Sequence, residues 1–241
     1  LRSVKEIIGY KIKSNDGQYG QVDDFLFHCE NWNIIYLSAD IGNWFTDHKL
    51  LITPEAFGEP VWRDKEFPVH LTNKEIERSP EIDEHPPYSL LQTKLSTKKY
   101  HLLYCPDGAL APESSQFPTL IDACNLSTNT EDKSNYPLRS VNEIIGYALH
   151  ALGGSAGHLS DFIICDQTWK IKHLIADTGK EVAINPEWTE SIDWESRCLH
   201  VNRTVDQITN SPEYNPDDAV NQRKETVLYD YNGKPKKEHL N

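Results

Sequence analysis

A segment at the start of this chain occurs a second time further along it. Residues 1–42 match residues 138–179 without a gap, and 19 of the 42 positions are identical. The first copy then carries five extra residues, after which the match continues through Ser79-Pro80-Glu81 and Ser211-Pro212-Glu213. Similarity over about 80 residues is the signature of a duplicated structural unit. The chain is therefore expected to fold as two copies of one architecture.

The repeat divides the 241-residue chain into four parts. The first copy is expected to span residues 1–85 and the second residues 138–215. Residues 86–137 are expected to form a helical tail and a linker, because 125–137 is rich in Asn, Thr, Ser and Asp. Residues 216–241 are expected to form a C-terminal helical tail, since apolar residues recur through 217–231 in an amphipathic pattern.

Short helical turns and tight turns are predicted at matching places in both copies. Ser3-x-x-Glu6 is a capping box that opens a helical turn, and Gly9 is expected to end it. Gly17-x-x-Gly20 has the pattern of a hairpin turn, because glycine adopts positive φ without steric cost. Thr72-x-x-Glu75 and Thr204-x-x-Gln207 open a second short helix. The second copy repeats the first set of signals at Ser140, Glu143, Gly146, Gly154 and Gly157.

Residues of the β type fill most of the remaining sequence of each copy. Strands are expected over 22–27, 34–41, 159–164 and 171–176, with shorter ones at 50–52, 61–62 and 69–71. Five or six short strands in about 80 residues are too few for a sandwich, and closure into a barrel removes the exposed edges. The predicted fold is mainly β, with two small antiparallel β-barrels in tandem, short helical segments and tails.

Composition excludes several classes of partner. The formal net charge is −13, which disfavours binding to nucleic acid. No apolar run reaches the ~18–20 residues of a membrane span, and the first residues have no secretory signal pattern. The five cysteines form no CxxC pair and are expected to be free thiols in a reducing compartment. A cytoplasmic protein without a membrane span is the expectation.

Most recurring polar and aromatic residues are interpreted as structural. Asp24 is expected to accept backbone hydrogen bonds near the glycine turn, although an acid–base role for Asp23-Asp24 is the alternative. Asp40 is expected to accept turn N–H groups where a strand ends. Trp32 and Trp62, which recur as Trp169 and Trp194, are expected to pack in the core. The structural repeat positions are Gly9, Gly20, Asp24, Trp32, Asp40, Gly146, Gly157, Asp161, Trp169 and Asp177.

The loop that only the first copy carries is the candidate partner-binding site. Its residues Asn43, Trp44, Phe45 and His48 place an aromatic pair on a loop, which is a common form of binding anchor. Packing of the same pair over the mouth of the barrel is the equal alternative. Both interpretations depend on a segment that the second copy lacks.

No catalytic, cofactor-binding or metal-ligating residues are predicted. His28-Cys29 and Asp47-His48 are the tight pairs of ligand-type residues, and neither has zinc-site spacing. The glycine-rich run 153–157 lacks the Lys-Ser/Thr of a phosphate loop, and no Gly-x-Ser-x-Gly elbow occurs. No cofactor is therefore expected.

The conserved framework of the two copies resembles the PRC-barrel family. The resemblance rests on Leu-Arg-Ser-Val-x-Glu-Ile-Ile-Gly-Tyr at 1–10 and 138–147, on the Gly-x-x-Gly turn with Asp-Phe after it, and on the Ile-Thr-Pro-Glu segment at 52–55. The family takes its name from the cytoplasmic domain of the photosynthetic reaction centre H subunit and includes a domain of a ribosome maturation factor. The closest resemblance is to bacterial proteins with two such domains. It implies two PRC-type barrels that act as an adaptor.

The function expected from sequence is therefore a non-catalytic adaptor, assembly or regulatory binding module with a protein partner. A homodimer is one further expectation. The alternatives are an RNA- or ribosome-associated factor, by analogy with the maturation factor, and an enzyme with a site between the two barrels. The adaptor predicts an exposed binding surface, whereas the enzyme predicts a cleft with converging carboxylates or histidines whose pKa values are shifted.

Overall fold

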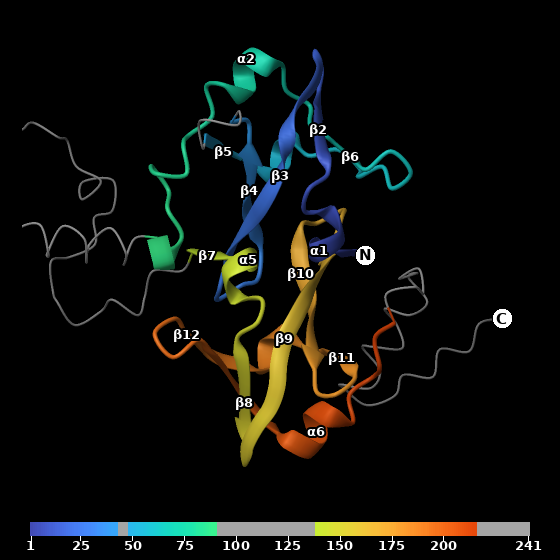
Figure 1. Ribbon diagram of the computed structural model, residues 1–241, viewed down its shortest axis with the longest axis vertical. Helices are drawn as coiled ribbons and strands as arrows, with labels where there is room; N and C mark the ends of the chain where they lie inside the picture. The colour runs from blue at the N-terminus through green and yellow to red at the C-terminus, as the bar shows by residue number, and fades with distance from the viewer. Residues whose placement is uncertain (43–47, 91–137, 216–241) are drawn as a thin grey trace, which may run out of the picture.

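The computed structural model describes residues 1–42, 48–90 and 138–215, and within them the chain is mainly β, as expected (Figure 1). Two curled sheets follow one another along the long axis, and one of them forms a half-barrel. Each sheet is built mostly from one copy of the repeat. Among the described residues, no helix has the length and apolar character that a membrane crossing requires.

The sheet of the first copy has the strand order β5-β4-β3-β2-β6. The strands β2 and β6 run parallel, and the other neighbours are antiparallel. The short strands expected at 61–62 and 69–71 are wrong in position, because Val61 pairs with Glu66 across a tight hairpin and the strand forms at 66–68. The strands are β2 (Lys11–Ser14), β3 (Gly17–His28), β4 (Ile34–Asp40), β5 (Lys49–Ile52) and β6 (Glu66–Pro68).

The sheet of the second copy has the equivalent order with one more strand, β11-β10-β9-β8-β13-β12. The strands β8 and β13 run parallel, as β2 and β6 do. The additional strand β12 pairs with β13 and lies at the end of the sheet. The strands are β8 (Ala148–Leu152), β9 (Gly154–Cys165), β10 (Lys170–Asp177), β11 (Glu181–Ile184), β12 (Thr189–Asp193) and β13 (Cys198–Thr204).

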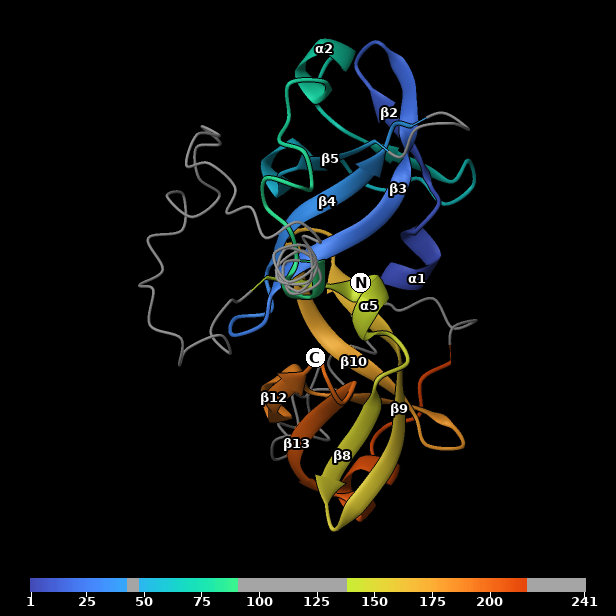
Figure 2. The same cartoon turned by 60° about the vertical axis from the view of Figure 1, so that its left-hand side comes forward.

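Each copy places its first strand in the sheet of the other copy. The strand β1 (Arg2–Ser3) pairs with β9 of the second copy, and β7 (Leu138–Ser140) pairs with β3 of the first copy. Figure 1 shows β7 beside β3, and Figure 2 shows α1 (Val4–Ile7) and α5 (Val141–Ile144) at the junction of the two sheets. The sequence repeat did not predict this reciprocal exchange, because an internal match carries no information about which copy a strand pairs with.

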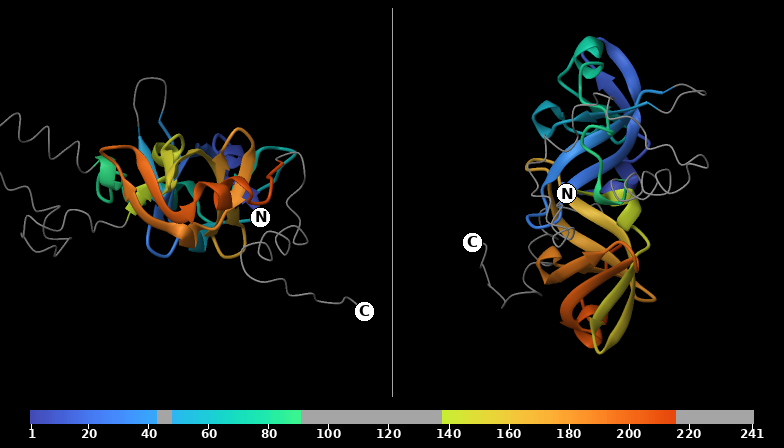
Figure 3. Two further views of the ribbon diagram at one scale, coloured as in Figure 1. Left: turned by 90° about the horizontal axis from the view of Figure 1, so that it is seen from below. Right: turned by 90° about the vertical axis from the view of Figure 1, so that its left-hand side faces the viewer.

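A second exchange joins the copies through their tryptophans. The backbone carbonyl of Trp169 accepts from the N–H of Ile34, and that of Trp32 accepts from the N–H of Ile171, both at 2.8 Å. Both tryptophans adopt positive φ and have buried rings. The ring of Trp32 stacks on Phe27, which in turn packs 5.6 Å from Phe162 of the second copy. One hydrophobic core therefore runs through both copies, along the elongated body seen in Figure 3.

The predicted helix caps form, with one difference. Thr72 and Thr204 make complete capping boxes at α2 (Asn73–Ile76) and α6 (Val205–Thr209). Ser3 and Ser140 accept from the N–H of the third helical residue, but the reciprocal carboxylate bond is not part of either cap. The carboxylate of Glu143 accepts instead from the hydroxyl of Tyr147 at 3.0 Å. Each copy also has a 3₁₀ turn, η1 (Pro54–Ala56) and η3 (Pro186–Trp188).

The second glycine of each Gly-x-x-Gly motif lies within a long strand and not in a hairpin turn. Gly20 belongs to β3 and Gly157 to β9, and both have positive φ. A Cβ on Gly157 would lie 2.0 Å from the carbonyl oxygen of Asp177, and one on Gly20 would lie 2.5 Å from that of Asp40. Glycine is therefore required at these points by the close approach of the neighbouring strand.

Replacing Gly157 with alanine should lower the free energy of unfolding by about 2–4 kcal/mol. Of this, ~1–2 kcal/mol is the cost of positive φ for a residue with a Cβ. The rest comes from overlap of the Cβ with the carbonyl oxygen of Asp177. Gly146→Ala is the matched control, because φ is +89° there and a Cβ meets no atom within 4 Å. It should cost only the backbone term of ~1–2 kcal/mol. Urea denaturation of both variants measures the difference, and equal losses would contradict the close-approach explanation.

Candidate functional site

Asp24 on β3 is buried where the second copy begins. Its carboxylate accepts hydrogen bonds from the hydroxyl of Ser140 and from the backbone N–H of Asn142, the latter at 3.0 Å. The N–H of Phe25 donates to it at 2.7 Å. The expectation of backbone donors is met, but two of the three donors named come from the other copy and none from the glycine turn. The side chain thus holds α5 against β3.

Asp161 makes the same contacts in the opposite direction. It accepts from the hydroxyl of Ser3 at 2.5 Å, from the N–H of Lys5 at 3.0 Å and from that of Phe162 at 2.7 Å. Burial raises the pKa of both aspartates, to about 7 for Asp24, although the hydrogen bonds that each receives act in the opposite sense. These carboxyls form two separate joints between the copies. They do not form an acid–base pair.

The raised pKa of Asp24 makes the free energy of unfolding depend on pH. Its pKa rises from the ordinary value of 3.8 to about 7 in the folded protein. Between these values the folded chain binds a proton that the unfolded chain has released. The contribution of Asp24 to stability is therefore fully present below pH 3.8 and is lost as the pH rises through about 7.

The expected result is that the stability difference between the wild-type protein and Asp24→Asn shrinks steadily as the pH rises from about 4 to about 7. Urea denaturation at a series of pH values measures it. Asp193→Asn is the control, because hydrogen bonds from Ser196 lower the pKa of Asp193 and move its effect below this range. If the difference in free energy of unfolding between the wild-type protein and Asp24→Asn does not change with pH, the raised pKa of Asp24 is contradicted.

The other aspartates of the repeat end strands, as the sequence indicated. Asp40 accepts from the N–H of Gly42 and Asp177 from that of Gly179, each at 2.9 Å. Of the candidate partner-binding loop, Asn43, Trp44 and Phe45 lie outside the described residues. His48 is described: it is exposed, and its Nε2 lies 3.4 Å from Glu81.

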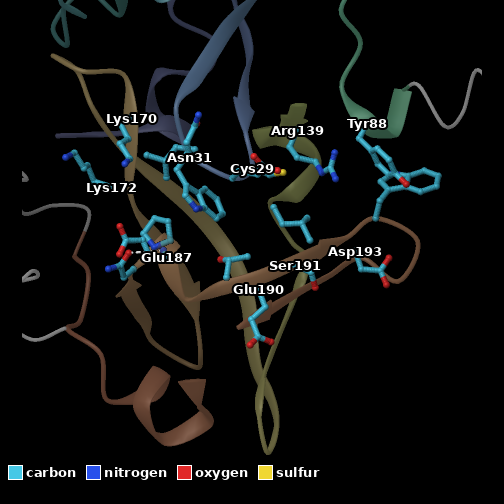
Figure 4. A pocket seen from close by; sticks show the side chains of 18 of the residues that line it. Cys29, Asn31, Tyr88, Arg139, Lys170, Lys172, Glu187, Glu190, Ser191 and Asp193 are labelled. Carbon is cyan, nitrogen blue, oxygen red and sulfur yellow. Dashed lines mark hydrogen bonds between the residues drawn. The ribbon is translucent and has the colours of Figure 1, made fainter. Parts of the chain in front are cut away.

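A groove of about 840 Å³ lies at the junction of the two copies, and residues of both copies line it (Figure 4). The β3–β4 turn of the first copy contributes Cys29 and Asn31, and the start of β10 contributes Lys170 and Lys172. The opposite wall is η3 followed by the whole of β12. The volume is within the usual range of ligand sites.

Charged side chains of both signs line the groove. Lys170 and Lys172 lie on one side, which also includes Glu30 of the β3–β4 turn, and Glu187 and Glu190 lie on the other (Figure 4). Across residues 1–42, 48–90 and 138–215, none of these five side chains makes an ion pair with a described residue. The hydroxyl of Thr189 on β12 is buried and has no hydrogen-bond partner in the same part of the chain. The groove therefore offers both signs of charge to a ligand.

An edge-on aromatic pair forms one end of the groove. Tyr88, from the segment that follows the first copy, packs edge-on against Trp194 with ring centroids 6.5 Å apart. The guanidinium of Arg139 lies 4.3 Å above the Tyr88 ring. Trp62 is 40% exposed, so the expectation that it packs in the core is wrong, whereas its counterpart Trp194 is partly buried and packs against the core. The ring of Trp62 lies at the surface beneath the guanidinium of Arg2.

The equivalent region of the first copy is closed by an ion pair. Arg2, the counterpart of Arg139, donates to Asp166 at 2.7 Å and lies 4.5 Å above the Trp62 ring. Cys29 stands in the groove at the position that Asp166 occupies in the repeat. The two copies differ at this position, and this difference determines which copy has the open groove. The sequence contained this signal, but only knowledge of the fold shows which differences face the same space.

Among the described residues, side chains that could act as metal ligands or as a nucleophile–base pair form no site. No group of three or more His, Cys, Asp or Glu side chains among the described residues has the arrangement of a metal site. Cys198 lies 3.7 Å from Nε2 of His150, at the place where the first copy has the Lys13–Glu66 ion pair at 3.0 Å. Cys198 is buried, so this contact replaces a structural pair. The pair His28-Cys29 forms no such contact, since Nδ1 of His28 accepts from the N–H of Glu30.

Comparison with protein-family models and with curated proteins finds no match for this chain.

Proposed function

We propose that this chain is a tandem PRC-barrel-type adaptor that binds a segment of a protein partner in the groove between its two copies. The observation that carries the proposal is that two lysines face two glutamates across the groove and that these four side chains make no ion pairs among the described residues. Charged side chains that face one another across an open groove give a partner both attraction and register. The proposal is for binding without catalysis.

The enzyme alternative requires carboxylates or histidines that converge on one point with raised pKa values. In the groove, Glu187, Glu190 and Asp193 are spread along one wall (Figure 4). Hydrogen bonds from Ser196 lower the pKa of Asp193, which is the wrong direction for a general acid. The geometry therefore favours binding over acid–base chemistry.

The RNA-associated alternative requires a continuous basic surface. The groove instead has lysines opposed by glutamates, within a chain of net charge −13. A phosphate backbone passing Lys170 and Lys172 would also pass Glu190 on the other wall, and the two effects would oppose each other. A protein segment with both signs of charge satisfies both walls.

The double variant Lys170→Glu/Lys172→Glu should lose most of the partner that the wild-type protein retains in affinity capture from its source. The physical reason is that glutamates at these two positions repel the acidic side chains of the partner that the lysines attract. Lys11→Glu/Lys180→Glu is the matched control, because it changes the net charge equally at exposed sites outside the groove. Quantitative mass spectrometry compares the three captures, and thermal unfolding checks that each protein folds.

Equal recovery of partner by the groove variant and the wild-type protein would contradict a role for the groove. Equal loss in both double variants would show that net charge, and not the groove, governs binding. Either outcome would remove the support that the charged walls give to the proposed function.

A further inference from the structure

The strand β12 forms one wall of the groove and is the last strand of its sheet. Thr189, Ser191, Ile192 and Asp193 lie in register with residues of β13, and no other strand of the described chain pairs with β12. All five β12 residues line the groove. One edge of the strand therefore faces the groove with main-chain groups that have no strand of the described residues beside them.

The repeat identifies which main-chain groups face outward. In the first copy, Val61 and Glu66 exchange two backbone hydrogen bonds, at 2.8 and 3.1 Å. Their counterparts are Asp193 and Cys198, which are directly opposite in the β12–β13 register. Opposed residues in an antiparallel ladder alternate between bonded and non-bonded pairs. The neighbouring pair Ile192–Leu199 is therefore the non-bonded one, and the N–H and C=O of Ile192 point away from β13.

The first copy has closed this edge. Pro60 stands where the second copy has Ile192, and Gly58 stands where it has Glu190. Proline has no N–H to offer, and it is one of the devices by which proteins protect sheet edges from pairing. No strand is assigned over Phe57–Val61 in the first copy, whereas β12 is a five-residue strand. The same architecture thus has one blocked edge and one edge that retains its donor.

We propose that the partner segment binds as an added strand on the β12 edge, in an extended conformation and with both acidic and basic side chains. This proposal rests on the proposed function of the groove. Main-chain bonds to Ile192 supply the attachment, and the charged walls supply the selection of sequence. Acidic side chains of the segment face Lys170 and Lys172, and basic ones face Glu190, which belongs to β12 itself.

Charge complementarity favours a peptide over other occupants. The lysines belong to β10 and the facing glutamates to η3 and β12, so an inserted strand lies between these lysines and these glutamates. Cross-strand pairs of opposite charge stabilise added strands. An extended chain with side chains of alternating charge supplies both the main-chain and the side-chain contacts.

A synthetic peptide tests the proposal directly. The probe is a fluorescein-labelled octapeptide in which valine alternates with charged residues, the charges being glutamate and lysine in turn. Fluorescence anisotropy should show saturable binding to the full chain. The same peptide methylated at its backbone nitrogens keeps the side chains but cannot pair as a strand, and its affinity should be at least about tenfold lower.

The matched protein variants are Ile192→Pro and Ile192→Val. The first places in the second copy the residue that the first copy already carries at Pro60, so the fold is expected to accept it. It should weaken probe binding at least about tenfold, whereas Ile192→Val keeps the N–H and should stay within about twofold of the wild-type affinity. Amide hydrogen exchange gives a second measurement: the Ile192 N–H should become protected only when the probe is added.

Three results would overturn the added-strand proposal. They are equal binding of the methylated peptide, equal binding by Ile192→Pro, and protection of the Ile192 amide before any peptide is added. Protection that grows with protein concentration would identify a second copy of the chain as the occupant and would equally overturn it. If Lys170→Glu/Lys172→Glu loses the captured partner while Ile192→Pro retains it, the proposed function stands and only the added strand fails.

Discussion

Two buried carboxyl groups, those of Asp24 and Asp161, join the two copies at the centre of the structure. A carboxyl group removed from water is costly unless hydrogen bonds replace its hydration. Each of these aspartates receives such bonds from the hydroxyl and backbone of the other copy, through Ser140 and Ser3. Neither copy can therefore satisfy its own buried aspartate alone. The exchanged strands β1 and β7 and the shared core follow from the same constraint, since each helix cap is positioned by the opposite sheet.

The reciprocal joint explains why the two copies keep the same residues at some positions and differ at others. Positions that contact the other copy, such as Ser3 and Asp24, must match their counterparts because both halves of the joint use them. Positions that face the surface beside the joint are free of that constraint. Cys29 in place of an aspartate, and Ile192 in place of a proline, lie among these. The groove is thus a local departure from symmetry on a symmetric framework.

The sequence predicted the elements well and their partners poorly. Capping residues such as Thr72 act within four residues of themselves, so local pattern was sufficient to place them. The strand-internal role of Gly20 was missed, because a Gly-x-x-Gly spacing does not distinguish a turn from a close approach of two strands. Trp62 was expected in the core, since a large aromatic is usually buried, but Arg2 covers it at the surface. Contacts between copies depend on topology, which the repeat leaves undetermined.

The groove was beyond prediction for the same reason. Lys170 and Glu190 are separated by 20 positions and have no shared motif, so only the fold shows that they face one another. Duplication within one chain also has a consequence that a dimer of identical single copies would not. In such a dimer both edges would carry the same residue, and both would be open or both closed. Covalent duplication lets Pro60 block one edge while Ile192 leaves the other free. Under the proposed function, the protein keeps one binding edge and avoids the aggregation that two open edges invite.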